Sequence, residues 1–132
     1  SNYQLARRTI QGSESNRLNI LIAIIEKHLN LNLASSDVYV KIVGGLKINE
    51  PALDLAILVA IYSAYKNKPI DSSTVFFGEV GLTGNLGTVN NASKRLIEAK
   101  KYGFNKAICP DVVDKKITVK GISELAELPK LL

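Results

Sequence analysis

The sequence predicts an α+β or α/β domain with one hydrophobic core. Segments of helical periodicity are interspersed with short segments rich in β-branched residues. Of the 132 residues, 46% are hydrophobic and 22% are charged, which is typical of a globular protein. No internal repeat or low-complexity tract interrupts the pattern, so we expect a single domain over residues 1–132.

Two apolar helices are expected in the first half of the chain. The first covers residues 16–31, and its apolar residues recur at three- and four-residue spacing on one face. They are Leu18, Leu21, Ile22, Ile24, Ile25 and Leu29. The second covers residues 50–65 and begins with Pro51, where a missing N–H costs nothing. It is almost wholly apolar, which predicts a central, buried helix.

Short strands and two further helices are expected in the remaining sequence. The predicted strands cover residues 37–43, 75–80, 106–109 and 116–119. A basic amphipathic helix over residues 90–102 ends at Gly103, and a terminal helix over residues 123–128 ends at Pro129. Glycines after the second strand predict a turn or hairpin there; they are Gly81, Gly84 and Gly87.

Several classes of function lack their sequence signature. The longest apolar runs, around residues 20–25 and 55–61, are well short of the roughly 18 residues that span a membrane. The glycine-rich stretch over residues 78–87 lacks the lysine and the spacing of a phosphate-binding loop. We therefore expect neither membrane insertion nor a nucleotide site in this chain.

The single histidine and the single cysteine do not predict a reactive site. His28 has no cysteine or acidic pair at ligand spacing, so a helix-end histidine is favoured over a metal ligand. Cys109 lies in a short apolar run before Pro110, where a small buried hydrophobic residue fits. A thiol protease would require the fold to unite these two residues and to expose the thiol.

Two motifs depart from ordinary globular sequence. They are Val43-Gly44-Gly45-Leu46-Lys47-Ile48-Asn49-Glu50-Pro51-Ala52-Leu53-Asp54-Leu55-Ala56 and Phe77-Gly78-Glu79-Val80-Gly81-Leu82-Thr83-Gly84. Together they resemble the C-terminal, Lon-protease-like domain of the bacterial RadA (Sms) family of DNA repair proteins. The likeness continues over nearly the whole chain, through residues 7–9, 16–18, 37–40 and 95–99. It implies an α+β fold like the Lon proteolytic domain, with a mixed sheet packed against helices.

The resemblance to Lon also locates a catalytic dyad that this chain lacks. Lon presents its nucleophile in a Gly-Pro-Ser-Ala-Gly motif, and matching the proline to Pro51 places Ala52 at the serine. Matching Asn90-Asn91 to the paired glycines before the Lon lysine places Ser93 at that general base. A methyl group cannot attack a carbonyl, and a neutral hydroxyl is a poor base. Even if Lys94 replaced the base, no serine lies near Ala52 in the sequence.

The resemblance implies a non-enzymatic role within a larger ATPase. The parent protein would carry a zinc-binding segment and a RecA-like core that binds ATP and Mg²⁺, and this domain would hold no cofactor. It would support a ring, hexameric as in the family, and DNA binding during branch migration in the bacterial cytoplasm, in association with the nucleoid. The alternatives are a residual Lon-type peptidase and a purely structural oligomerisation domain.

The distribution of positive charge favours a nucleic-acid partner. The formal net charge is +5, and residues 91–106 hold five basic residues against one acidic residue. The candidate DNA contacts, which include a second set around the N-terminal segment, are Arg7, Arg8, Arg17, Lys41, Lys47, Lys94, Arg95, Lys100 and Lys101. The alternative is a solvated helix face, since exposed lysines are common and no aromatic residues interleave with the basic ones.

Two carboxylates mark the start of the second helix. Glu50 and Asp54 are four residues apart and share one helix face. We expect them to cap backbone amides or to bind an arginine of the same or a neighbouring subunit. Acid–base catalysis by the pair is disfavoured, because neither a nucleophile nor a metal ligand accompanies it.

Overall fold

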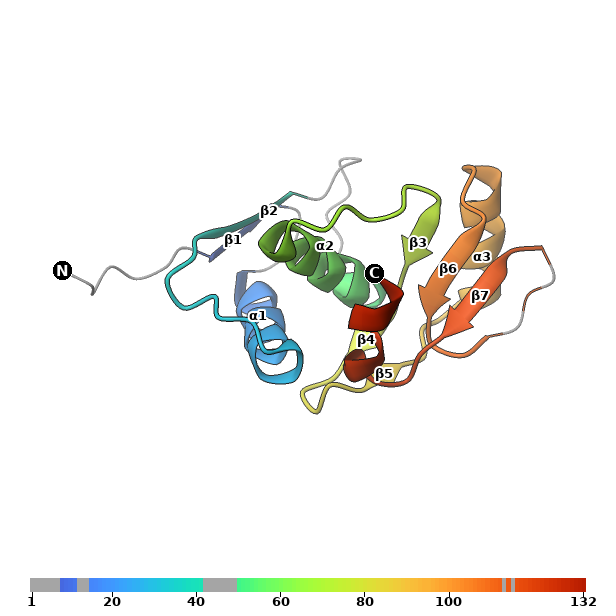
Figure 1. The fold of residues 1–132 in the computed structure, drawn as a ribbon. Coiled ribbons are helices and arrows are strands. Elements are labelled where there is room, and N and C mark those ends of the chain that lie inside the picture. The colour runs from blue at the N-terminus through green and yellow to red at the C-terminus, as the bar shows by residue number, and fades with distance from the viewer. Residues whose placement is uncertain (1–7, 12–14, 42–49, 113, 115) are drawn as a thin grey trace.

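A computed structural model describes residues 8–11, 15–41, 50–112, 114 and 116–132 (Figure 1). The backbone alone is described for residues 8–11 and 15. The strands are β1 (Arg8–Gln11), β2 (Val38–Lys41), β3 (Thr74–Phe76), β4 (Glu79–Val80), β5 (Leu86–Gly87), β6 (Lys106–Cys109) and β7 (Thr118–Gly121). The helices are α1 (Ser15–Leu29), α2 (Asp54–Lys66) and α3 (Ala92–Lys101), with 3₁₀ turns η1 (Pro51–Leu53), η2 (Leu125–Glu127) and η3 (Pro129–Leu131).

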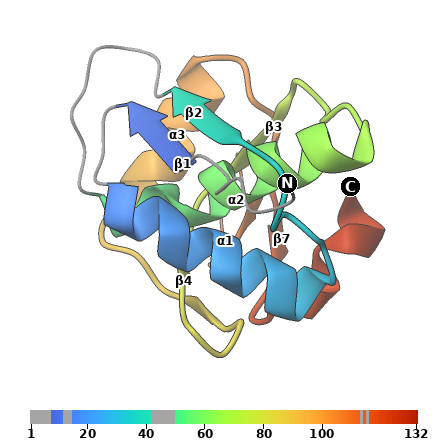
Figure 2. The ribbon, with the colours of Figure 1, turned by 90° about the vertical axis from the view of Figure 1, so that its left-hand side faces the viewer.

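The N-terminal part is a parallel strand pair covered by α1. β1 and β2 pair in parallel, with Arg8 opposite Val38 and Gln11 opposite Lys41. Both strands lie side by side over α1 (Figure 2). The predicted apolar face of α1 is buried, and Leu18 and Ile25 have no exposed surface. The periodicity of this helix is therefore confirmed, and the strand predicted over residues 37–43 is confirmed within the described residues.

α2 is the central element of the main core. Leu55 and Leu58 are fully buried, and Val59 is 2% exposed. These residues pack in one cluster with α1, β2, β4 and the C-terminal turns. The prediction of a buried helix is confirmed, although its first turn, η1, is a 3₁₀ turn.

The three-stranded parallel sheet separates two apolar clusters. Its strand order is β3-β6-β7, and α3 lies against one face, behind the sheet in Figure 1. Along β6, Ala107 and Cys109 pack in the cluster of α3, whereas Ile108 packs in the main core. This alternation is the expected period of a strand buried on both faces.

Four details of the predicted fold are wrong. The strand over residues 75–80 is divided into β3 and β4, and the terminal helix over residues 123–128 is instead η2 followed by η3. Parallel and antiparallel pairs lie in separate sheets of the described chain, so they do not form one mixed sheet. β1 was not predicted, because four residues carry too weak a pattern.

The division of the 75–80 strand occurs at Gly78, which contacts a segment distant in the sequence. Its backbone hydrogen-bonds to the start of α2, and its φ of 152° favours glycine. The short terminal turn has a local cause: the Glu127 carboxylate accepts hydrogen bonds from the backbone N–H groups of Ser123 and Glu124, and Pro129 then starts η3.

The glycine-rich stretch forms the predicted hairpin, with β4 antiparallel to β5. Gly84 has a φ of 79°, and a Cβ atom there would lie 2.8 Å from Nδ1 of His28. The His28 ring Nε2 is 3.2 Å from the carbonyl oxygen of Leu82. The hairpin therefore needs glycine at this position to pack on the end of α1.

We predict that Gly84→Ala lowers the free energy of unfolding by about 2 kcal/mol, through left-handed backbone strain and displacement of the histidine ring. Gly87→Ala is the matched control, because a Cβ atom there would meet only the Glu79 carbonyl oxygen at 3.8 Å. Urea unfolding of both variants checks this. Equal stabilities would show that the His28 contact does not constrain the hairpin.

Candidate functional site

Asp54 forms the inner part of a polar cluster at the start of α2. It is 5% exposed and lies among apolar residues. Its Oδ1 accepts a hydrogen bond from Nε of Arg17 at 2.7 Å and forms an ion pair with Nη2 of the same guanidinium. Its Oδ2 accepts the backbone N–H of Val80 at 3.0 Å. Both carboxylate oxygens are thus satisfied by α1 and β4.

Glu50 forms the outer part of the cluster. Its backbone carbonyl accepts from Nη2 of Arg17 at 2.9 Å. Its Oε1 lies 3.3 Å from Nη2 of Arg95 on α3 and also accepts the N–H of Ala52 at 3.3 Å. The expectation that these carboxylates bind arginine and cap amides is confirmed, with both arginines supplied by the same chain. We call Arg17, Glu50, Asp54 and Arg95 the arginine clamp.

Gly78, two residues after β3, hydrogen-bonds through its backbone to the same helix start. The N–H of Gly78 donates to the carbonyl of Ala52 at 2.9 Å, and the N–H of Leu55 donates to the carbonyl of Gly78 at 3.1 Å. A Cβ atom at residue 78 would lie 3.1 Å from Cδ of Pro110. Glycine is therefore required where this backbone crosses the start of α2.

The clamp connects the two segments that contain the positions matched to the Lon dyad. Ala52, 2% exposed, is two residues from Glu50, and the exposed Ser93 is two residues from Arg95. Asn91, matched to a Lon glycine, has a φ of 60°, a conformation that glycine adopts readily. The Glu50–Arg95 ion pair therefore connects the two segments that hold the matched positions, with Ala52 buried and Ser93 exposed.

The other motif residues are placed as follows. Pro51 is the first residue of η1, and Glu50 caps this turn. Glu79 is exposed on β4, and Gly81 donates its N–H to the carbonyl of Asn85 within the hairpin. Gly44 and Gly45 lie outside the described residues.

Cys109 is buried in the cluster under α3, with no exposed surface. Burial, and secondarily the charge of Asp111, raises the pKa of its thiol to about 11. Little thiolate therefore forms at neutral pH, and the thiol has no access to a substrate. This agrees with the interpretation of Cys109 as core packing and argues against a thiol protease.

The structure separates the candidate basic residues into different groups. Arg17 and Arg95 are engaged in the clamp, and Nε of Arg95 also donates to the carbonyl of Asn90. Lys94, Lys100 and Lys101 are exposed on α3. Lys41 is exposed on β2, a strand that lies on the other side of α2 from α3 (Figure 1). The side chain of Arg8 and the residues Arg7 and Lys47 lie outside the described part.

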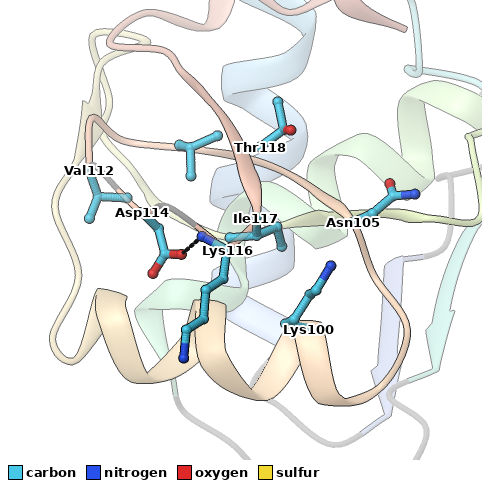
Figure 3. Close-up of a pocket in the computed structure, with 8 residues that line it drawn as sticks. Lys100, Asn105, Val112, Asp114, Lys116, Ile117 and Thr118 are labelled. Carbon is cyan, nitrogen blue, oxygen red and sulfur yellow. Dashed lines mark hydrogen bonds between the residues drawn. The ribbon is translucent and has the colours of Figure 1, made fainter.

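Sequence reasoning missed a cavity of about 480 Å³ between the end of α3 and β7. Its lining residues are Lys100, Asn105, Val112, Asp114, Lys116, Ile117, Thr118 and Val119 (Figure 3). It also missed Tyr102, 79% exposed at the end of α3. Tyr102 follows Lys100 and Lys101 directly in the sequence, so the interpretation that no aromatic residue interleaves with the basic ones was wrong.

The described residues contain no group of three or more histidine, cysteine or acidic side chains arranged to hold a metal ion. Among them, no helix combines the length and apolar character needed to cross a membrane.

Fold and site together define a small α+β domain built around an arginine-clamped helix start, with a lysine-bearing helix beside it. The chain belongs to the family described as "Subunit ChlI of Mg-chelatase", whose model matches residues 5–112. The predicted kinship with the RadA family is also confirmed by curated relatives, each named DNA repair protein RadA.

The identities to these RadA relatives are substantial, but the chain matches only part of each. The protein of Helicobacter pylori is 45% identical over 114 residues, 86% of this chain and 25% of the relative. The Rickettsia bellii protein is 43% identical over 131 residues, 99% of this chain and 29% of the relative. That of Streptococcus pneumoniae is 41% identical over 131 residues, 95% of this chain and 31% of the relative. The chain thus spans about a quarter to a third of their length.

Asp54 should contribute more than Glu50 to the free energy of unfolding. We predict that Asp54→Asn lowers the free energy of unfolding by about 3 kcal/mol, because a buried pair loses one charge and an amide N–H group then faces donors. Glu50→Gln should cost less than about 1 kcal/mol, because its pair with Arg95 is partly exposed.

Denaturant unfolding of the two isosteric variants measures the difference. Equal losses in both would contradict the assignment of Asp54 as the anchor of the clamp.

Proposed function

We propose that this chain is a non-proteolytic, Lon-like domain of a RadA-type DNA repair protein, and that it serves in ring assembly and DNA binding. The observation that carries this proposal is the burial of the position that we match to the nucleophile, in the turn before α2. Ala52, which we match to the Lon nucleophile, is 2% exposed, and its carbonyl accepts the N–H of Gly78. Kinship with RadA supplies the DNA repair context.

The backbone donors at the start of α2 also argue against peptidase chemistry. A hydrolase needs free N–H groups there to stabilise an oxyanion. Here the N–H of Ala52 donates to the Glu50 carboxylate, that of Leu53 donates to the Glu50 carbonyl, and that of Leu55 donates to Gly78. The chain's own acceptors fill the place where a substrate carbonyl would bind.

We predict that Ala52→Ser creates no peptidase activity, because the new hydroxyl would be buried beside engaged amides and without a lysine base at residue 93. A fluorogenic peptide assay on the original chain, Ala52→Ser and the double variant Ala52→Ser with Ser93→Lys checks this. A Lon-type peptidase serves as the positive control. Turnover by the original chain would favour the residual-peptidase alternative and overturn the proposal.

DNA binding is supported by the exposed charge on α3. Lys94 and Lys101 are seven residues apart and therefore share one face of the helix. Arg95 is engaged by Glu50, so its replacement would disturb the fold as well as the surface charge. The lysines are better probes of phosphate contact, because they are exposed and lie outside the clamp.

We predict that the chain binds DNA with salt-sensitive affinity, and that Lys94→Ala with Lys101→Ala weakens binding and reduces the magnitude of the salt slope by about two. The control is Lys27→Ala with Lys66→Ala, which removes equal charge from the ends of α1 and α2. Fluorescence anisotropy across a salt series measures both. No binding at low salt would favour a purely structural domain.

The remaining parts of the proposal concern the whole protein. We propose that it assembles as a ring, hexameric as in the RadA family, and drives branch migration with ATP and Mg²⁺. These ligands and Zn²⁺ would bind parts of the protein outside this domain, and the protein would act in the bacterial cytoplasm. The length of the relatives supports this division, since each is more than three times as long as the matched segment.

A further inference from the structure

We propose that the groove between β2 and α2 binds an extended peptide segment of a partner protein, which adds to the sheet as a strand beside β2. The peptide would carry apolar side chains at alternate positions and an acidic side chain opposite Lys41. The lining of this groove includes neither the arginine clamp nor the lysines of α3, so the inference goes beyond DNA binding and is independent of it.

The outer edge of β2 is open in the described chain. β2 pairs in parallel with β1, and the two strands form a sheet of their own. In Figure 2, β1 lies along one side of β2, and no other described strand pairs with the opposite side. Only about half of a strand's backbone N–H and C=O groups point toward one neighbour. The other half of those in β2 therefore face away from β1, where a further strand can pair with them.

A groove of about 400 Å³ runs along this edge of β2. On the strand side, its lining includes the consecutive residues 37–41. Neighbouring residues of a strand point to opposite faces of the sheet, so consecutive residues line one groove only where it follows the strand's edge. On the helix side, the lining residues of α2 share one face: Ala60, Ile61, Ala64 and Tyr65. The groove thus places an open strand edge opposite a helix wall.

The groove has the length of a short strand segment. β2 has four residues, and at about 3.3 Å per residue it spans about 13 Å. An added strand would therefore pair over about four or five residues. Ala60 and Ala64 are exposed small side chains one helical turn apart, and they leave room between helix and strand for the side chains of a peptide.

Each wall of the groove presents an exposed tyrosine. Tyr39 of β2 is 61% exposed and Tyr65 of α2 is 43% exposed, and both are lining residues. Tyrosine is enriched at protein–protein interfaces, because its ring offers a large contact area and its hydroxyl can hydrogen-bond to a partner. The charged residues of the described lining are Asp37 and Lys41, whose charges cancel. This balance favours a peptide over a polyanion such as DNA.

Lys41 sets the charge preference of the peptide. It is exposed at the end of β2 and lines the groove. Opposite charges at facing positions of paired strands attract, whereas like charges repel. An acidic side chain opposite Lys41 would therefore fix the register of the added strand, and a lysine there would oppose binding.

A free peptide fits this groove better than a second copy of the chain does. In a second copy, the same edge of β2 lies beside its own α2. Pairing of the two edges would bring both helices to the junction, where each would take the space that the opposite strand needs. A peptide segment has no flanking helix and can enter the groove, as in other cases of recognition by strand addition.

The test measures fluorescence anisotropy of labelled peptides of about nine residues, in which valine, leucine or tyrosine alternates with threonine and one central threonine is replaced by glutamate. We expect at least one peptide of this panel to bind. Two isomers of the best binder, N-methylated at alternate residues in the two possible phases, should differ in affinity by at least about tenfold, because only one of them loses the donors that face β2.

Variants of the chain locate the contact. Ala64→Tyr should weaken binding of the best peptide by at least about tenfold, because the new ring would fill the groove. Ala23→Tyr is the matched control, since Ala23 is exposed on α1 and is not a lining residue. Lys41→Glu should reverse the charge preference, so that a peptide with lysine in place of glutamate binds better. All three positions are exposed, and thermal unfolding should be unchanged in each variant.

Hydrogen exchange supplies an independent readout, because the peptide should slow exchange of backbone amides in β2. Failure of the whole panel to bind, unchanged binding by Ala64→Tyr or unchanged exchange in β2 would overturn the proposal. Sedimentation of the original chain as a dimer that Ala64→Tyr converts to a monomer would identify a second copy as the occupant and would also overturn it. The assay contains no DNA, so none of these outcomes bears on the DNA-binding function.

Discussion

The buried carboxylate of Asp54 is the constraint on which the rest of the structure depends. Burial of an unpaired carboxylate costs several kcal/mol, so Asp54 needs partners for both oxygens. Arg17 brings α1 to one oxygen, and the amide of Val80 brings β4 to the other. Because these partners come from distant parts of the sequence, satisfying one side chain fixes the relative positions of two helices and a hairpin.

The same region engages the backbone donors at the start of α2 with acceptors of the chain itself. Glu50 uses its carboxylate to cap the turn before α2 and to hold Arg95, and Gly78 takes the next free backbone donor. The N–H groups of Ala52, Leu53 and Leu55 therefore all donate to acceptors within the chain. A scaffold with these contacts is suited to present surfaces to partners, since its elements are joined at the point where a substrate would otherwise need access.

The sequence predicted the elements whose stability comes from repeated local patterns. α1 and α2 follow from apolar periodicity, and β6 coincides with its predicted residues because a proline ends it. Two of the errors arise where tertiary contacts override the pattern. Gly78 interrupts a strand because its backbone pairs with α2, and nothing in the run of residues 75–80 encodes that partner. β1 exists through pairing with β2, which a four-residue segment cannot reveal.

The roles of the charged residues could not be predicted from the sequence pattern either. A count of basic residues along the chain treats Arg17, Arg95 and the lysines of α3 alike, but the fold uses them differently. Each arginine contacts more than one acceptor, which suits the several donors of a guanidinium: Arg17 contacts Asp54 and Glu50, and Arg95 contacts Glu50 and Asn90. The lysines of α3 stay exposed, where an ammonium group keeps its hydration and can exchange it for phosphate. The two arginines are therefore engaged within the fold, whereas Lys94, Lys100 and Lys101 of α3 remain exposed.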